Sequence, residues 1–422
     1  MKSLFVWFFI LLFTSYLFPH EQPVHQHIVR QAWLRLKLDH PTYNGLEMDD
    51  WIGYAQTDGP WSYDNQGRVV AGAWREDDED VVWGYSCPTN PLPIWQTFAY
   101  TNTHFWKVDN GTEFEHNIFS SECTVALECG DYPNAYQKIR KYQEGGWTLK
   151  KNYSVGQIHN VTFLNWNGGP DIHVVSYGPI GFRYRGLTEG PLNLYGTGYM
   201  EVVGYTRQDG AFEEYTVPYK IKHPKNKYYA YEILGRMCHL MGDLGVPAHI
   251  HIDTHPDVCD HGDSYETRMK DYYNNYTAYN TNGTTIDPMG RSTPPLLYLA
   301  EVMAQTADMF PSNDFLGNTD YFPHPHMPPP PPQMGWGTFT GYGKNGVSQQ
   351  NFEKIANYCM RYNIRTTAGL LYWFIITTGQ NLTIPDVERI SYNLPDKHIN
   401  IGETGIFTCY PNNPTYTYTW ER

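Results

Sequence analysis

The sequence predicts a mainly α-helical protein that carries a β-rich insertion and a β-type C-terminal segment. Three observations predict this: apolar residues recur at helical spacing near the start and in four later segments, short strand-type runs fill the middle, and strand-type residues follow position 390. With 422 residues, the chain is long enough for two or three domains.

Residues 1–19 are typical of a signal peptide. Lys2 precedes an apolar run from Leu4 to Phe18, which is about as long as a signal-peptide core and too short to span a bilayer comfortably. An uncleaved N-terminal anchor is the alternative. We therefore expect a secreted or extracytoplasmic protein. In that oxidising setting we also expect at least one disulfide bond, whose pairing the sequence leaves open among candidates such as Cys87, Cys123 and Cys129.

The first helix is predicted over residues 22–38, where Val24, Ile28, Val29 and Ala32 recur at helical spacing. Residues 40–110 are rich in turns and aromatics. Later helices are predicted over residues 228–244, 263–273, 295–310 and 350–378. The proline-rich run at 323–332 is expected to be an extended surface loop.

The β-rich insertion is predicted over about residues 110–225, with strand-type runs at 157–163 and 171–177. The C-terminal segment, residues 391–422, has further strand-type runs at 399–409 and 415–420. A Cys followed eleven residues later by a Trp suits the opening of an immunoglobulin-like sandwich, here truncated. A short β tail on the main domain is the alternative.

Histidine and acidic residues are densest between His239 and Glu266. His239 and Asp243 are four apart on a predicted helix, so they share one face. Pro247 is expected to end this helix and to leave His249 in the following turn. A single helical His is more often packed or solvated than a ligand, but several beside carboxylates predict a zinc site. It is not the zincin pattern, because no Glu follows His239 directly.

This stretch resembles the bacterial zinc-dependent phospholipase C family, whose core is His-x3-Asp-x5-His with a later His and a Glu on the next helix. The later His of the family lies four residues before the Glu, whereas His261 lies five before Glu266. Asp263 and His255 are therefore alternatives to His261. His251 and His255 are expected to be spectators, and Glu266 also fits a capping box that begins at Asp263.

Three upstream elements extend the resemblance to residues 20–110 and 228–380, without the insertion or the tail. A His before Ile-Val and Ala selects His25 over His27. The spacing Gly-x4-Asp selects Asp77 within an acidic run that would otherwise be read as a solvated loop, with Asp78 as its alternative. His104 begins a His-Phe-aromatic element.

The resemblance implies an all-helical catalytic domain over residues 20–390 with three zinc ions. By the same resemblance, the ligands of the first ion are Asp77, His104, His239 and Asp243, those of the second are His249, His261 and Glu266, and Asp243 bridges to a third that is completed by His25 and the mature N-terminal residue. Asp77 is also the expected catalytic residue, because a carboxylate can orient or deprotonate a metal-bound water.

The expected function is that of a secreted zinc hydrolase that cleaves phosphodiesters, with phospholipids as substrates and peripheral contact with a membrane surface. A net charge of -14 argues against stable nucleic-acid binding. One alternative is the related single-strand nuclease family, whose Gly-Gly-Asn and His-x2-Trp-Asp elements this sequence lacks. The other is a non-catalytic surface protein that zinc only stabilises.

Overall fold

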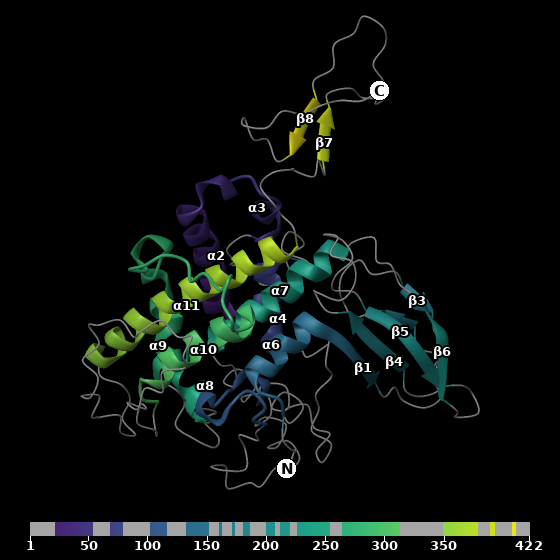
Figure 1. Ribbon diagram of the computed structural model, residues 1–422, viewed down its shortest axis with the longest axis horizontal. Helices are drawn as coiled ribbons and strands as arrows, with labels where there is room; N and C mark the ends of the chain where they lie inside the picture. Colours follow the sequence, from purple (N-terminus) through teal and green to yellow (C-terminus); the bar gives the residue numbers. More distant parts are fainter. Residues whose placement is uncertain are drawn as a thin grey trace, which may run out of the picture.

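The structure is a computed structural model, shown in Figure 1. It describes residues 22–53, 68–78, 102–115, 132–151, 226–253, 264–312 and 349–378, together with the backbone of the remaining strands of the insertion and tail. In this part of the chain the fold is mainly helical, as the sequence predicts. No helix there is both long enough and apolar enough to cross a membrane.

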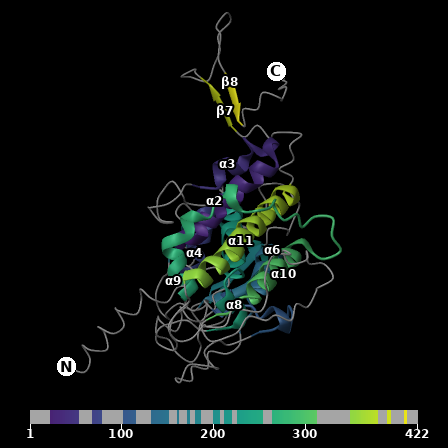
Figure 2. The ribbon, with the colours of Figure 1, turned by 90° about the vertical axis from the view of Figure 1, so that its left-hand side faces the viewer.

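Five longer helices form the centre of the fold. They are α2 (Gln22–Asp39), α4 (Val69–Asp78), α7 (Asn226–Asp243), α10 (Pro295–Asp308) and α11 (Gln349–Thr377). α7 packs on α2, α4 and α11, and α11 also packs on α2 and α10; Figure 2 shows α11 running diagonally across this group. Four of the five cover segments predicted as helices, so those predictions are confirmed.

Shorter elements surround this centre. They are η1 (Pro41–Tyr43), α3 (Glu47–Trp51), η3 (Asn102–His104), η4 (Val108–Asn110), α6 (Ala135–Glu144), α8 (Pro247–His251), α9 (Ser264–Tyr272), η5 (Tyr273–Asn275) and η6 (Ala278–Asn280). α9 confirms the helix predicted over residues 263–273. It brings its first turn, with Glu266, to the helical centre.

The helix α2 illustrates why the sequence pattern works. Val24, Ile28, Val29, Ala32 and Leu36 lie on one face and are 0–1% exposed. Each such side chain adds about 1.5–3 kcal/mol when it is fully buried. The helix is therefore held by its apolar stripe, and His25 is carried into the interior at a position beside that stripe.

Helices α4 and α7 cross with their backbones in contact. A Cβ atom at Gly72 would lie 1.9 Å from the carbonyl oxygen of Glu232, and a Cβ at Gly235 would lie 2.0 Å from the carbonyl oxygen of Val69. Only glycine fits at either position, because any side chain would force the two helices apart. This close crossing brings Asp77, one and a half turns after Gly72, towards the end of α7.

Two helices correct the sequence prediction. α4 lies in the stretch 40–110 that was predicted to be rich in turns, and it places Asp77 in a buried helical turn, not in a solvated loop. α6 lies inside the predicted β insertion, yet it is helical and its Ile139 and Tyr142 belong to the core. The first strand of the described residues begins at Gly145, directly after α6.

Pro247 also departs from its predicted role. α7 ends at Asp243, before Pro247 is reached. Pro247 lies in the first turn of a new helix, α8, which contains His249. Proline is favoured there because its missing N–H would have no partner in the first turn of a helix. His249 is therefore held by helical geometry, and the prediction that it lies in a turn is wrong.

The strands form three antiparallel groups. β1 (Gly145–Lys151), β4 (Ile180–Arg185), β5 (Met200–Thr206) and β6 (Phe212–Tyr219) pair in the order β1-β4-β5-β6; β2 (Asn160–Thr162) pairs with β3 (Asp171–His173); and β7 (Arg389–Tyr392) pairs with β8 (Phe407–Tyr410). β2 and β3 lie within the runs predicted at 157–163 and 171–177. A sandwich domain at the C-terminus stays a prediction.

Several predicted features lie outside the described residues. They are the signal peptide at 1–19, the cysteines Cys87, Cys123 and Cys129, the proline-rich run at 323–332, and the strand-type run at 415–420. Among the described cysteines, Cys238 and Cys359 are buried free thiols. Burial raises the pKa of both thiols well above its usual value, so both stay protonated at neutral pH.

Candidate metal centre

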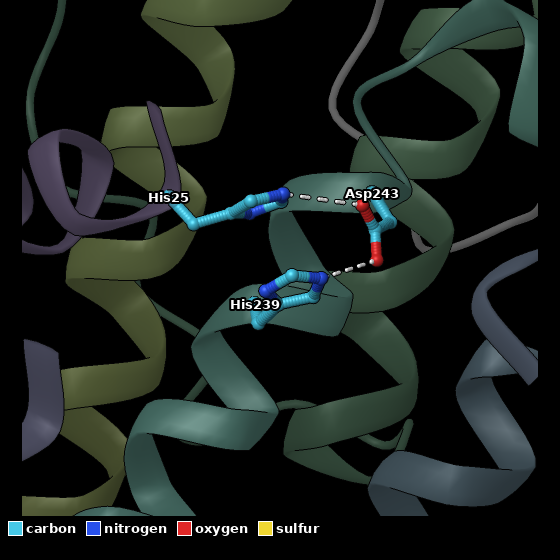
Figure 3. A group of neighbouring side chains, drawn as sticks. All are labelled: His25, His239 and Asp243. Atoms are coloured by element: carbon cyan, nitrogen blue, oxygen red, sulfur yellow. Dashed lines mark ion pairs between the residues drawn. The ribbon is translucent and has the colours of Figure 1, made fainter. Parts of the chain in front are cut away.

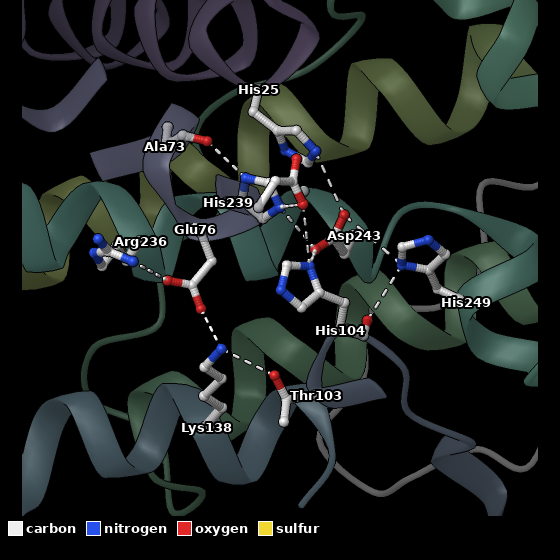
Figure 4. A network of polar contacts seen from close by, with 12 residues as sticks. His25, Ala73, Glu76, Thr103, His104, Lys138, Arg236, His239, Asp243 and His249 are labelled. Carbon is white, nitrogen blue, oxygen red and sulfur yellow. Dashed lines mark hydrogen bonds and ion pairs between the residues drawn. The ribbon is translucent and has the colours of Figure 1, made fainter. Parts of the chain in front are cut away.

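Six predicted ligands from five elements meet in the interior. His25 comes from α2, Asp77 from α4, His104 from η3, His239 and Asp243 from α7, and His249 from α8. All six are at most 1% exposed. Residues that are more than two hundred positions apart in sequence thus converge at the crossing of α2, α4 and α7, as Figure 4 shows.

His239 stands at the middle of this group. Its Nε2 lies 3.2 Å from Oδ1 of Asp77 and 3.2 Å from Oδ2 of Asp243. Its Nδ1 is 2.6 Å from the carbonyl oxygen of Ala73. A carbonyl can only accept a hydrogen bond, so Nδ1 carries the proton and directs Nε2 at the two carboxylates.

His25 approaches from the other side (Figure 3). Its ring stacks on that of His239 at 3.6 Å between centroids, and its Nε2 lies 3.4 Å from Oδ1 of Asp243. A Cβ at position 242 would lie 2.6 Å from Nδ1 of His25, so Gly242 leaves the space that the ring occupies. His27 instead contacts the carbonyl of Tyr276 at 2.6 Å. His25, and not His27, therefore lies in this cluster.

His104 closes the group from the short helix η3. Its Nδ1 lies 2.8 Å from Oδ2 of Asp243 and 3.7 Å from Oδ1 of Asp77. Burial lowers the pKa of His104 to about 4, although Asp243 partly offsets this. The ring is therefore neutral at pH 7, which is the state in which an imidazole binds a metal.

His249 and Glu266 form a second group of contacts beside the group around His239. Nε2 of His249 lies 3.4 Å from Oε1 of Glu266, and Nδ1 lies 3.7 Å from Oδ1 of Asp243. Nδ1 also donates to the carbonyl of His104 at 3.2 Å, and the ring stacks on Phe105. His239 and His249 thus share one arrangement, with Nδ1 fixed by a backbone carbonyl and Nε2 directed at a carboxylate.

The other predicted candidates divide into two sets. His251 contacts the carbonyl of Phe310 through Nε2 at 2.8 Å and lies outside the cluster, as expected of a spectator. His261, with its alternatives His255 and Asp263, lies outside the described residues, as does the side chain of Asp78. The described part of the chain therefore brings together seven of the eight predicted ligands.

The charges within the cluster are strongly coupled. Burial by itself would lower the pKa of His239, but Asp77 and Asp243 outweigh it and raise that pKa well above its usual value. Burial would likewise raise the pKa of Asp243, but His239, His104 and His25 hold it well below its usual value. His239 therefore carries a proton between two carboxylates, and a metal ion entering the cluster has to displace it.

The donor atoms fit a metal ion. Nδ1 of His104 and Nε2 of His239 face Oδ2 of Asp243 at 2.8 and 3.2 Å, and all of these atoms are buried. Two groups of three, His25/His239/Asp243 and Asp77/His104/His239, have their ligand atoms within 4.8 Å of one another. Tetrahedral zinc with bonds of about 2.1 Å places ligand atoms about 3.4 Å apart, close to several of these contacts. The cluster can therefore hold a metal ion.

A second buried cluster lies directly beside the first, and we call it the ion cluster. Its members are Arg75, Glu76, Lys138, Glu232 and Arg236, each at most 4% exposed. Glu76 accepts from Lys138 at 2.6 Å and from Arg236 at 3.0 Å through different oxygens, and Arg75 donates to Glu232 at 2.9 Å. Burial opposes ionisation of Glu76, but the two cations overcome it and lower its pKa to about 2.

Few features of the sequence predict this ion cluster. Glu76 stands in an acidic run, and such a run is usually a solvated surface. The helical spacing of Val69, Val70 and Ala73 was the available signal for α4, and with it for burial of this run. Lys138 and Arg236 carry no local mark that separates them from surface cations.

Comparison with known proteins adds no relative: no protein-family model, no curated protein and no solved structure matches this chain.

Proposed function

We propose that this protein is a zinc-dependent phosphodiesterase that hydrolyses phospholipids in the manner of a phospholipase C. One observation carries the proposal: four imidazoles and two carboxylates converge in a fully buried cluster. Mixed imidazole and carboxylate donors are typical ligands of zinc. The sequence resemblance supplies the substrate class.

The proposed ligand sets follow the contacts. Asp77, His104, His239 and Asp243 would hold one zinc, and His25 together with Asp243 would hold a neighbouring one. His249 and Glu266 would hold a third, with His261 as the proposed additional ligand. Asp243 is central because its two oxygens face four different imidazoles.

Bound zinc would supply positive charge for an anionic phosphodiester and would lower the pKa of a bound water to about 7. The protein's own residues supply orientation and proton transfer. Asp77 is the proposed catalytic carboxylate, which orients the attacking water and accepts its proton. Ala73 fixes the tautomer of His239 through its carbonyl oxygen, so the ring keeps one orientation throughout.

The proposed setting is outside the cytoplasm, at a membrane surface. This part rests on the predicted signal peptide and on the resemblance, which makes the mature N-terminal residue a zinc ligand. Removal of residues 1–19 is then a requirement for full metal loading. Phospholipid or another phosphodiester is the proposed partner, and stable binding of nucleic acid is not expected.

The experiment combines metal analysis with two substrates. Mature protein, its first residue identified, is analysed for zinc and then offered phosphatidylcholine or single-stranded DNA. About three zinc ions per chain with release of diacylglycerol is the expected result. Rapid DNA cleavage without diacylglycerol would assign the protein to the nuclease-like alternative. One tightly held zinc without hydrolysis of either substrate would leave a structural role.

A further inference from the structure

Helix α6 is fastened to the segment that carries His104. Asn134 and Gln137 form reciprocal hydrogen bonds between side chain and backbone at the start of the helix, at 2.8 and 2.9 Å. The side chain of Asn134 also donates to the carbonyls of Thr112 and Phe114. The N–H of Ala135 donates to the carbonyl of Phe105 at 2.9 Å. The first turn of α6 therefore holds residues 105–114 in place.

Lys138 continues this fastening from inside the protein. Its ammonium group is fully buried and donates to Oε1 of Glu76 at 2.6 Å and to Oγ1 of Thr103 at 2.9 Å. Figure 4 shows Lys138 reaching from α6 towards both side chains. Glu76 directly precedes Asp77 and Thr103 directly precedes His104, so one ammonium connects the immediate neighbours of two predicted ligands.

Stability alone does not explain a buried ammonium at this place. Burying a charge is costly, and well-packed apolar residues of similar volume are often as stable as a buried ion pair or more so. An apolar side chain would fill the space equally well. It would not supply two directed hydrogen bonds that join α4 to the η3 segment.

We propose that Lys138 is a positioning residue of the metal centre, which fixes Asp77 and His104 relative to each other by bridging Glu76 and Thr103. The inference rests on the metal binding in the proposed function, but not on the substrate. Residues that orient metal ligands typically change metal affinity by about 10–100-fold when they are replaced.

The test measures metal affinity and coordination geometry. Lys138→Met keeps the length of the side chain and removes the ammonium, while Thr103→Val keeps the shape of the side chain and removes the accepting hydroxyl. Zinc affinity is measured by competition with a chromophoric chelator, and the visible spectrum of the Co²⁺-loaded protein reports the ligand geometry. Both variants are expected to bind zinc about 10–100-fold more weakly and to show an altered Co²⁺ spectrum.

A matched control lies on the same helix. Arg140 is two residues from Lys138, is partly exposed and pairs with the exposed Glu113 at 2.8 Å. Arg140→Met removes a cation from α6 without touching the metal centre, so it is expected to keep wild-type affinity and spectrum. A loss as large as that of Lys138→Met would show that any change in α6 weakens the site, and would overturn the proposal.

A second variant separates positioning from stability. Arg236→Met removes the other cation that pairs with Glu76 and so lowers the melting temperature, but it leaves the bridge from Lys138 to Thr103 in place. Near-wild-type zinc affinity is therefore expected in spite of the lower stability. A loss of affinity as large as that of Lys138→Met would overturn the proposal, as would wild-type affinity and spectrum in Thr103→Val.

Metal binding and hydrolysis by the wild-type protein distinguish a failure of the proposed function from a failure of the role proposed for Lys138. Co²⁺ binding without hydrolysis of phosphatidylcholine would reject the proposed function and leave the role of Lys138 to be decided by its variants. A wild-type protein that binds neither Zn²⁺ nor Co²⁺ would reject both. If Lys138→Met does not fold, Thr103→Val decides the question, because it keeps the ion pair between Lys138 and Glu76.

Discussion

The metal centre and the ion cluster are neighbours with the same burial and opposite charge balance. The ion cluster contains two carboxylates, Glu76 and Glu232, and three permanent cations. In the metal centre, Asp77 faces His104 and His239, and the ion-pair partners of Asp243 among the described residues are all imidazoles. The carboxylates of the ion cluster are matched by its own cations, with one positive charge in excess, whereas the candidate metal centre has donor atoms suited to a cation from outside.

The difference shows what decides the role of a buried carboxylate. Glu76 and Asp77 are consecutive on α4 and both are 0% exposed. Successive residues on a helix point about 100° apart, so Glu76 meets Lys138 and Arg236 while Asp77 meets His239. The facing element, not the residue type or its degree of burial, places Glu76 in a structural ion pair and Asp77 among the candidate ligands.

The largest expected effect comes from removing charge at the centre of the metal cluster. Asp243→Asn is expected to lower zinc content and to reduce hydrolysis by about 10³-fold, or about 4 kcal/mol, because a bridging carboxylate is lost. Zinc content by mass spectrometry and turnover measure the two effects. Asp109→Asn, at an exposed acidic residue nearby, is the control and should change neither. Full activity of Asp243→Asn would refute the site.

The ion cluster should respond differently. Arg236→Met leaves Glu76 with one cation fewer in a fully buried place, and is expected to cost about 3–5 kcal/mol of unfolding free energy. Because this cluster binds no metal, saturating zinc should raise the melting temperature of variant and wild type equally. Denaturant unfolding measures the loss. Arg140→Met, at an exposed pair, should cost less than about 1 kcal/mol. Zinc rescue of Arg236→Met would contradict the separation of the clusters.

As the pH falls, zinc should leave the metal centre before the ion cluster loses its stabilising ion pairs. The pKa of Glu76 is lowered from 4.5 to about 2, so its stabilisation is complete above pH 4.5 and is lost as pH falls towards 2, at about 3 kcal/mol in total. The raised pKa of His239 makes protons compete with metal at higher pH. Zinc release, followed with a dye, should therefore precede unfolding, followed by circular dichroism. Coincident transitions would show that the clusters act as one unit.

The smallest effects come from two glycines on the same helix. Gly235→Ala pushes against the backbone of α4 and should cost about 1–3 kcal/mol of stability, with a loss of zinc affinity as Asp77 moves from His239. Gly242→Ala pushes only against the ring of His25, so it should weaken zinc binding with a stability change below about 1 kcal/mol. Chemical denaturation and zinc competition measure both. Equal stability losses would contradict this assignment of the two contacts.

The sequence by itself determined most of the helical fold and pointed to the side chains that converge in the candidate metal centre. Apolar spacing placed α2, α7, α9, α10 and α11, because helical periodicity is a local property of the chain. Residue type and spacing also selected the ligands that converge, including His25 in preference to its neighbour His27. These signals are carried by residues within a few turns of one another.

Only the tertiary structure decided which members of the acidic run at residues 76–80 belong to a buried cluster. The burial of Glu76 and Asp77 depends on α4, which the sequence did not predict, and on partners far along the chain. Arg236, for example, lies 160 positions from Glu76. It also decided that α6 supports the metal centre through Lys138, and that His249 lies in a helix that starts at Pro247. Such contacts depend on which helix faces which, and no local periodicity encodes that choice.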